Sequence, residues 1–193
     1  MSNAQHSQVK AEWYTPETFL LVAKKVLGTI DLDPASDENG NILVGAQRFI
    51  TKEQDGLTCE WLPDDTHPVT IWMNPPGPVR RKKGAPMLPE NRPLPKLFWE
   101  RLMVYRSRNQ VQHAIVAAFS IEQLQQSQNW GVSSMMEFPF CIPKRRVQWN
   151  AAPDAAEANS PTHASAFIYV PGTIDRTVDF EFWFSELGNV SLP

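Results

Sequence analysis

An apolar stretch that stops at two prolines, residues 69–76 (VTIWMNPP), constrains the fold of this chain most. Its β-branched and aromatic residues predict a short strand that is buried on both faces. Pro75 and Pro76 end this strand, because proline has no backbone donor and a fixed φ. Proline also keeps the residue before it extended, so Asn74 is expected at the strand's carboxyl end. In open α/β sheets, ligands bind at that end of the strands.

The Asn-Pro-Pro sequence has a chemical use at such a position. An amino group on a base or an amide is a poor nucleophile, because its lone pair is delocalised. The side-chain oxygen of Asn74 and the backbone carbonyl of Pro75 can each accept one N–H of that group, which favours the geometry for attack on a methyl sulfonium. A plain strand-to-loop turn explains the tripeptide equally well, since the chain has 17 prolines.

Length and composition indicate one globular domain. The chain has 193 residues, of which 42% are hydrophobic and 20% are charged, and these values exclude a largely disordered protein. We expect a flexible start over residues 1–11 and a single domain over residues 12–193, with a basic, proline-rich insertion at residues 78–96.

Other features disfavour several classes of protein. No run of about 18 apolar residues predicts a transmembrane helix, and the polar amino terminus does not resemble a secretory signal. Cys59 and Cys141 lie far apart, and the four histidines have no metal-ligand spacing. We therefore expect no metal, no membrane partner and a reducing cytoplasm.

Positive charge is concentrated next to the Asn-Pro-Pro sequence. Residues 78–108 carry nine Lys or Arg against two acids, so this segment is +7, whereas the whole chain is −3. Such segregation favours a phosphate-facing edge on an otherwise acidic body. A solvated charged loop is the alternative for the run Arg80, Arg81, Lys82 and Lys83, but its attachment to the Asn-Pro-Pro loop favours nucleic acid.

Alternating strand and helix patterns predict an α/β fold. Helices are expected over residues 16–27, 97–105 and 120–128, and strands over residues 29–33, 48–51, 69–73, 113–119, 166–170 and 180–184. Residues 37–45 are expected to form a loop, and residues 138–149 an edge segment beside the substrate. For the first helix we expect Thr15 as N-cap, Pro16 as the first helical residue and Gly28 as the stop. Ser120 and Gln123 predict a capping box.

Two acids are candidates for ligand contacts. Asp33 ends a short strand, and Asp55 lies in a turn. An acid at the carboxyl end of a strand can accept hydrogen bonds from an amine or hydroxyl of a ligand. A turn or cap role is the alternative for either residue. The small-residue turn after Asp33 is too poor in glycine to bind a triphosphate or a dinucleotide.

Four motifs together resemble the phage-type DNA N-6-adenine methyltransferase family (Dam-like). They are Trp13-x-Thr15-Pro16, Asp31-Leu32-Asp33-Pro34-Ala35-Ser36, Thr51-x-Glu53-x-Asp55-Gly56-Leu57 with Trp61, and Asn74-Pro75-Pro76. Their order and spacing match over roughly residues 12–77, and a weaker match continues through the strand at His113 and residues 145–170. The resemblance implies a Rossmann-like fold that uses S-adenosylmethionine, with a mostly parallel sheet and helices on both faces. It also implies a phage or prophage protein that works in the cytoplasm of a bacterial host.

The resemblance further implies roles for individual residues. The residues expected to bind the cofactor are Trp13, Thr15 and Pro16 on its methionine side, Asp33, Pro34 and Ala35 at its amino-acid end, and Asp55 near its ribose or adenine. Those expected to hold the target amine, on an adenine flipped out of double-stranded DNA, are Asn74, Pro75 and Pro76. From their charge rather than from the resemblance, the residues expected to contact the DNA are Arg80, Arg81, Lys82, Lys83, Arg145 and Arg146.

One position departs from the family pattern. Asn-Pro-Pro is usually followed by Tyr or Phe, whose ring stacks on the flipped base, whereas this chain has Gly77. Stacking on an aromatic ring is worth ~1–3 kcal/mol per base. Trp72, Phe98 and Trp99 are candidates for a substitute ring.

Three functional hypotheses follow. The first is a DNA adenine methyltransferase, and the second is a catalytically impaired module of the same fold that binds DNA or cofactor. The third is a methyltransferase that acts on another acceptor, such as a glutamine amide or an RNA base. The basic segment and the motif set favour the first.

Overall fold

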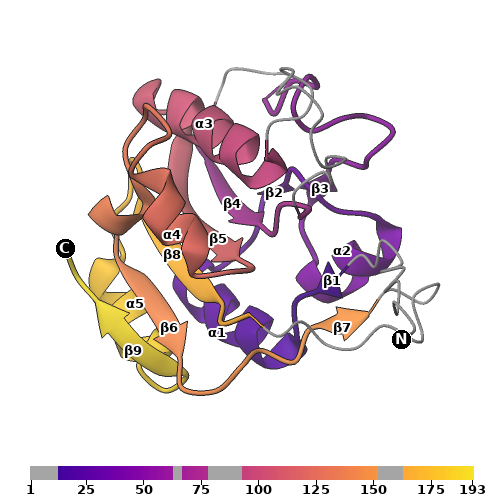
Figure 1. Cartoon of the computed structure of the whole chain (residues 1–193). Coiled ribbons are helices and arrows are strands. Elements are labelled where there is room, and N and C mark those ends of the chain that lie inside the picture. Colours follow the sequence, from indigo (N-terminus) through magenta and orange to yellow (C-terminus); the bar gives the residue numbers. More distant parts are fainter. Residues whose placement is uncertain (1–12, 63–66, 78–92, 152–162) are drawn as a thin grey trace, which may run out of the picture.

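The computed structural model describes residues 13–62, 67–77, 93–151 and 163–193, and these form a mixed α/β structure around one sheet (Figure 1). Seven strands make up this sheet in the described residues, in the order β3-β2-β4-β5-β8-β6-β9. Their bounds are β2 (Leu32–Asp33), β3 (Arg48–Phe49), β4 (Val69–Met73), β5 (Val111–Ala118), β6 (Phe140–Pro143), β8 (Ala166–Pro171) and β9 (Gly188–Ser191). A separate antiparallel pair consists of β1 (Trp13–Tyr14) and β7 (Asn150–Ala151).

The sheet is mixed rather than mostly parallel, which corrects the expectation from the sequence. β3, β2, β4 and β5 run parallel to one another, but β8 is antiparallel to both β5 and β6, and β9 is antiparallel to β6. β6 therefore points in the same direction as β5. The carboxyl ends of β2, β3, β4, β5 and β6 consequently lie at one edge, which is called the carboxyl edge below.

Helices cover both faces of the sheet (Figure 1). Their bounds are α1 (Glu17–Leu27), α2 (Glu38–Val44), α3 (Leu94–Ser107), α4 (Glu122–Ser127), the 3-10 helix η2 (Met135–Glu137) and α5 (Thr177–Phe184). One core lies between the sheet and α3, α4 and η2, and a second lies between the sheet and α1 and α5. Among the described helices, none is both long and apolar enough to cross a bilayer.

The strand expected at residues 69–73 is confirmed as β4, buried on both faces. Ile71 and Met73 belong to the α3 core, whereas Trp72 belongs to the α1/α5 core. This alternation explains why the strand is a continuous apolar run, since each face packs against its own helical layer. The strands expected at 113–119 and 166–170 are confirmed as β5 and β8.

Two expected elements are wrong. Residues 180–184 form the last part of α5 rather than a strand. Phe180 and Phe184 lie four residues apart and stack with ring centroids 4.4 Å apart, so the helix buries both on one side. Residues 37–45 are not a loop: Asp37 caps α2 by accepting the Gly40 N–H, and left-handed Gly45 ends it.

The expected caps are also corrected. α1 begins after Pro16, which is its N-cap, and Thr15 makes no capping hydrogen bond; Gly28 does end the helix. Ser120 accepts the Glu122 N–H, but the side-chain oxygen of Gln123 is buried without a partner, so no capping box forms there. A capping box exists instead between Ser134 and Glu137 at η2.

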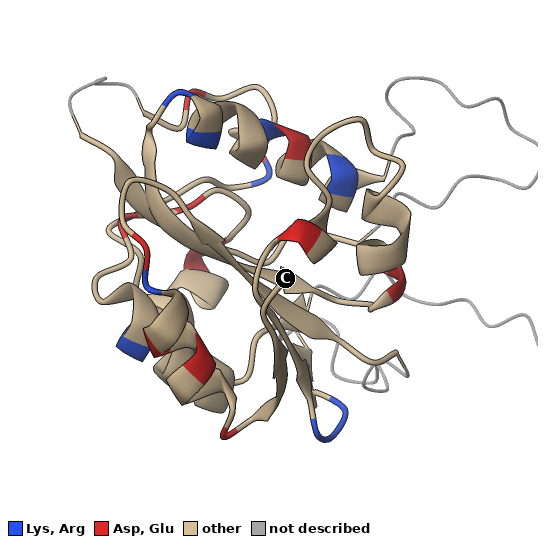
Figure 2. Ribbon diagram, turned by 90° about the vertical axis from the view of Figure 1, so that its left-hand side faces the viewer, with Lys and Arg blue, Asp and Glu red and all other residues tan. Residues whose placement is uncertain are grey.

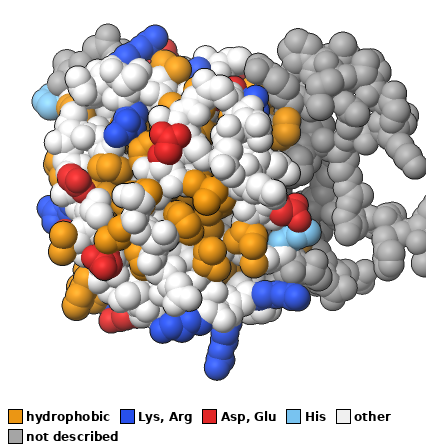
Figure 3. Space-filling view, turned by 60° about the vertical axis from the view of Figure 1, so that its left-hand side comes forward, with side chains coloured by type: hydrophobic (Ala, Val, Ile, Leu, Met, Phe, Trp, Pro, Cys, Tyr) orange, Lys and Arg blue, Asp and Glu red, His pale blue; other side chains and the backbone are white. Residues whose placement is uncertain are grey.

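The sheet edge at β9 carries exposed apolar side chains. Figure 3 shows this side of the molecule, where hydrophobic side chains gather between scattered charged ones. Ile142 on β6 and Leu192 after β9 are 37% and 46% exposed. The polar residues that the motifs single out, Asp33 and Asn74, lie at the ends of β2 and β4, in the half of the sheet away from β9.

Candidate functional site

The motif residues meet at the carboxyl edge, at the point where the strand order reverses. The chain runs from β2 to β3 on one side, and β4 then returns to the other side of β2. Leu32 of β2 pairs with Ile71 of β4, so Asp33 and Asn74 follow at the same end of neighbouring strands. This reversal is the position at which open α/β sheets bind ligands.

Asn74 is fixed by a hydrogen bond to the start of the chain. Its side-chain nitrogen donates to the backbone oxygen of Trp13 at 2.9 Å. Because the nitrogen is engaged, the amide oxygen is left to accept a donor, and no described residue supplies one. Asn74 is half-buried and Pro75 is buried, whereas Pro76 is exposed. The Asn74 amide oxygen therefore lacks a partner among the described residues, and its role as an acceptor stays a prediction.

β1 holds this corner together through three contacts: the bond from Asn74 to Trp13, the pairing with β7, and a bond from Tyr14 to Asp37. Trp13 and Tyr14 pair with β7, and the Tyr14 hydroxyl donates to Asp37 at 2.8 Å. Asp37 in turn caps α2. Sequence reasoning did not predict Tyr14 and Asp37 as part of the site, because a two-residue strand and a short polar helix give almost no periodic signal.

Asp33 is a buried carboxyl group at the end of β2. It is 2% exposed and accepts the Ala35 N–H at 3.1 Å. Burial raises its pKa from 3.8 to about 7, although the hydrogen bonds from Ala35 and Ser36 act in the opposite direction. A buried carboxyl with a raised pKa at a ligand edge is a candidate for pairing with a cation.

Thr15 lies between β1 and α1 with a hydroxyl that has no partner. Thr15 is 3% exposed, and its Oγ1 is buried without a hydrogen bond. An unpaired buried hydroxyl costs about 1–3 kcal/mol, so such groups are a sign of an absent ligand or water. Pro16 is half-buried beside it.

The turn that contains Asp55 packs against the end of β2. A Cβ added to Gly56 would lie 2.0 Å from the Pro34 carbonyl oxygen, so only glycine fits there. Trp61 holds the turn by donating its indole N–H to the Gly56 carbonyl at 2.8 Å. Asp55 itself is exposed, with φ +58°, and its carboxylate accepts from Leu57 and Thr58. These contacts match the turn role that the sequence leaves open for Asp55.

The aromatic residues proposed to replace the ring missing at Gly77 lie in the core. Trp72 and Trp99 are 0% exposed, and Phe98 is 5% exposed and packs against Gly56. None of the three can stack on a ligand in this arrangement. A Cβ at Gly77 would meet nothing within 4 Å, so the position is sterically open.

Three groups of basic residues bear on the predicted DNA contacts. Arg80, Arg81, Lys82 and Lys83 lie outside the described residues. Arg101 and Arg106 of α3 do not face solvent as phosphate ligands, because their guanidinium groups donate to the carbonyls of Leu57, Cys59 and Pro171.

Lys144, Arg145 and Arg146 form the third group and are exposed. They follow β6 at the carboxyl edge, and Figure 2 shows a basic loop that extends beyond the strands. From this loop the chain runs to β7, beside β1 (Figure 1). The loop and Asn74 therefore share one edge of the molecule.

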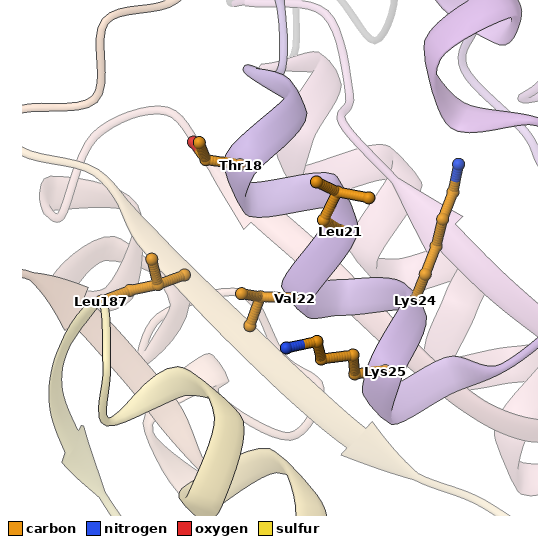
Figure 4. Close-up of a pocket in the computed structure, with 6 residues that line it drawn as sticks. All are labelled: Thr18, Leu21, Val22, Lys24, Lys25 and Leu187. Carbon is orange, nitrogen blue, oxygen red and sulfur yellow. The ribbon is translucent and has the colours of Figure 1, made fainter.

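Two surface hollows in the described structure lie away from this edge. One, of about 550 Å³, is lined mainly by α1 and Leu187 (Figure 4). Its lysines are engaged: Lys24 donates to the Leu43 carbonyl, and Lys25 lies 3.8 Å from the Trp183 ring centroid. The other, of about 540 Å³, lies at the amino ends of β2, β3, β4 and β5. In the described residues, no group of three His, Cys, Asp or Glu side chains could hold a metal ion.

Fold and site together define a mixed α/β protein with polar side chains at a topological switch point. Residues 2–86 match the family model described as DNA N-6-adenine-methyltransferase (Dam). This match covers less than half of the chain, includes all four motifs and confirms the resemblance to this family seen in the sequence, which supports a methyltransferase as the general kind of protein. No curated protein and no solved structure matches the chain.

Proposed function

We propose that this protein transfers a methyl group from S-adenosylmethionine to the exocyclic amino group of an adenine in double-stranded DNA. The observation that carries the proposal is the hydrogen bond from the Asn74 side chain to the Trp13 carbonyl. It joins the first and last of the four family motifs at a switch point and turns the Asn74 oxygen into a positioned acceptor. In this proposal, the sheet belongs to a Rossmann-like methyltransferase fold, and residues 12–193 form one domain.

The described residues fit the cofactor. The Asp33 carboxyl is buried with a raised pKa, and a neighbouring ammonium group would offset the cost of its charge. The Thr15 hydroxyl is buried without a partner. We assign Trp13, Thr15 and Pro16 to the methionine side, and Asp33 with Pro34 and Ala35 to the amino-acid end. Asp55 contributes by holding the turn whose Gly56 packs against the Pro34 carbonyl.

When bound, S-adenosylmethionine would supply an electrophilic methyl carbon to the adenine nitrogen, with a thioether as the leaving group and the displaced N–H proton passing to water afterwards. Asn74 and the Pro75 carbonyl each accept one N–H of the amine, which holds the nitrogen lone pair towards the methyl group. Pro75 and Pro76 keep this backbone rigid. No side chain is needed as a base before attack.

The basic loop supports DNA as the acceptor. Arg145 and Arg146 are exposed at the same edge as Asn74, where phosphates beside a flipped-out base would lie. We extend this assignment to Arg80, Arg81, Lys82 and Lys83, because they directly follow the Asn-Pro-Pro loop.

The glycine at position 77 favours a second candidate function. Since no ring stands at this position, a module that binds cofactor and DNA without efficient transfer fits the same fold. Cofactor binding would then persist while methylation fails.

The test combines two measurements. Calorimetry with S-adenosylmethionine measures binding, and labelled cofactor measures transfer to unmethylated duplex DNA, to RNA and to a glutamine-containing peptide. We expect binding and label on adenine in duplex DNA alone. Label on RNA or on the peptide would show that the acceptor is not duplex DNA alone. Cofactor binding without methyl transfer would favour the impaired module. Absence of cofactor binding would overturn the proposal.

A further inference from the structure

The missing ring at Gly77 raises the question of which described side chain contacts the target base. Such a residue must lie at the carboxyl edge, on the sheet face to which Asn74 points, and must be partly exposed. The alternation along β4 settles the face: Trp72 packs in the α1/α5 core, and Asn74 lies two residues further. The bond from Asn74 to Trp13, which packs on the same core, agrees with this.

Phe119 meets these conditions. Met73 pairs with Val116, so the neighbour of Asn74 on β5 is Ala117, and Phe119 follows two residues later. Ala117 belongs to the α1/α5 core and Phe119 packs against it, so Phe119 and Asn74 share a face. Phe119 directly follows Ala118, the last residue of β5, so it lies at the carboxyl edge. It is half-buried, unlike Trp72, Phe98 and Trp99.

Trp149 packs against the Phe119 ring, and Ser165 holds the Phe119 backbone. Its centroid lies 5.2 Å from that of Trp149. The Trp149 indole donates to the Ser165 hydroxyl at 3.2 Å, and this hydroxyl donates to the Phe119 carbonyl at 3.2 Å. Ser165 and Trp149 are both buried. A ring fixed in this way loses little conformational freedom when a second planar group stacks on it.

We propose that Phe119 is the stacking residue for the target base and takes the place of the ring absent at position 77. This inference rests on the proposed function. Stacking of one base on an aromatic side chain changes binding by about 10- to 100-fold. Asn74 holds the exocyclic amine while Phe119 contacts the ring plane, and the phenyl group carries no polar atom that would select one base by hydrogen bonding.

The test measures kcat/KM for unmethylated duplex DNA, the cofactor Kd and the thermal midpoint in each variant. We expect Phe119→Leu to lower kcat/KM by about 10- to 100-fold with an unchanged cofactor Kd, and Phe119→Tyr to retain activity. Phe140→Leu is the matched control, since Phe140 is half-buried but packs on the opposite core. Adding Gly77→Tyr to Phe119→Leu should restore activity, because position 77 is open.

The outcomes separate the two proposals. An active wild-type protein whose Phe119→Leu variant keeps its kcat/KM would overturn the role of Phe119 alone. The same conclusion follows if Trp13→Leu, and not Phe119→Leu, lowers kcat/KM without changing the cofactor Kd. A wild-type protein that binds cofactor but transfers no methyl group to DNA would overturn the proposed function, and the role of Phe119 with it.

Discussion

The side-chain nitrogen of Asn74 lies 2.9 Å from the backbone oxygen of Trp13, a residue 61 positions earlier in the chain. This bond fixes which way the amide faces, because the carbonyl of Trp13 can pair only with the nitrogen. The oxygen must then point to the other side, where an amine can donate to it. A single long-range contact therefore sets the polarity of the site.

The Asp33 carboxyl predicts how stability depends on pH. Its pKa is raised from 3.8 to about 7, so between pH 4 and pH 7 the folded protein retains a proton that the unfolded chain has lost. The free energy of unfolding should therefore fall as the pH rises through this window, by up to about 4 kcal/mol from this group. Denaturant unfolding at several pH values measures the slope. In Asp33→Asn that contribution should vanish, and an equally steep slope in this variant would contradict the assignment.

The same carboxyl predicts a proton linkage in cofactor binding. If the cofactor's ammonium group pairs with the Asp33 carboxylate, the pKa of Asp33 falls on binding. The protein then releases a proton near pH 6. Affinity should then rise between pH 6 and pH 8. Calorimetry in two buffers of different ionisation enthalpy counts the protons. Asp33→Asn should bind more weakly and release none, and an unaltered proton count would remove Asp33 from the cofactor site.

Gly56→Ala should damage the site from a distance. The new methyl group would lie 2.0 Å from the Pro34 carbonyl, which forces the turn after Asp33 to move. We expect a loss of at least about 1–3 kcal/mol in the free energy of unfolding and weaker cofactor binding. Gly77→Ala is the control, because that position is open and has no positive φ. Equal stability of the two variants would argue against close packing at Gly56.

Arg146→Ala should weaken DNA binding because the residue is exposed at the carboxyl edge. Loss of one phosphate contact should reduce the slope of log affinity against log salt by about 1. Arg108→Ala removes the same charge from an exposed position between α3 and the amino end of β5, at the opposite edge. Fluorescence anisotropy with a labelled duplex at several salt concentrations compares them. Identical slopes for both variants would remove the loop after β6 from the interface.

The strands that are buried on both faces could be predicted from the sequence. The mainly apolar runs at β4, β5 and β8 indicate buried strands, and the two prolines after Asn74 fix where β4 ends. α1 and α3 were also predictable from their apolar spacing. The position of Asn74 at a strand end followed from these local signals.

Other features depend on contacts that no local pattern encodes. α5 reads as a strand because Phe180, Phe182 and Phe184 alternate with charged or aromatic residues, yet the helix forms because Phe180 and Phe184 pack together against the sheet. β8 and β9 run opposite to the other strands of the sheet, and an apolar pattern does not encode the direction of a strand, so the mixed character of the sheet was missed. The sequence also could not show that Trp72, Phe98 and Trp99 are buried, because tertiary packing decides their burial.

Asn74→Ala tests the central claim most directly. The measurement is transfer of labelled methyl from S-adenosylmethionine to unmethylated duplex DNA, with mass spectrometry of the product and thermal unfolding as a check on folding. We expect label on N6 of adenine in the wild-type protein and a loss of about 100-fold or more in Asn74→Ala, the scale of removing one positioned hydrogen-bonding group in a transition state. The control Asn129→Ala alters an exposed residue beyond α4 and should retain activity. A folded Asn74→Ala protein that methylates adenine at the wild-type rate would contradict the account.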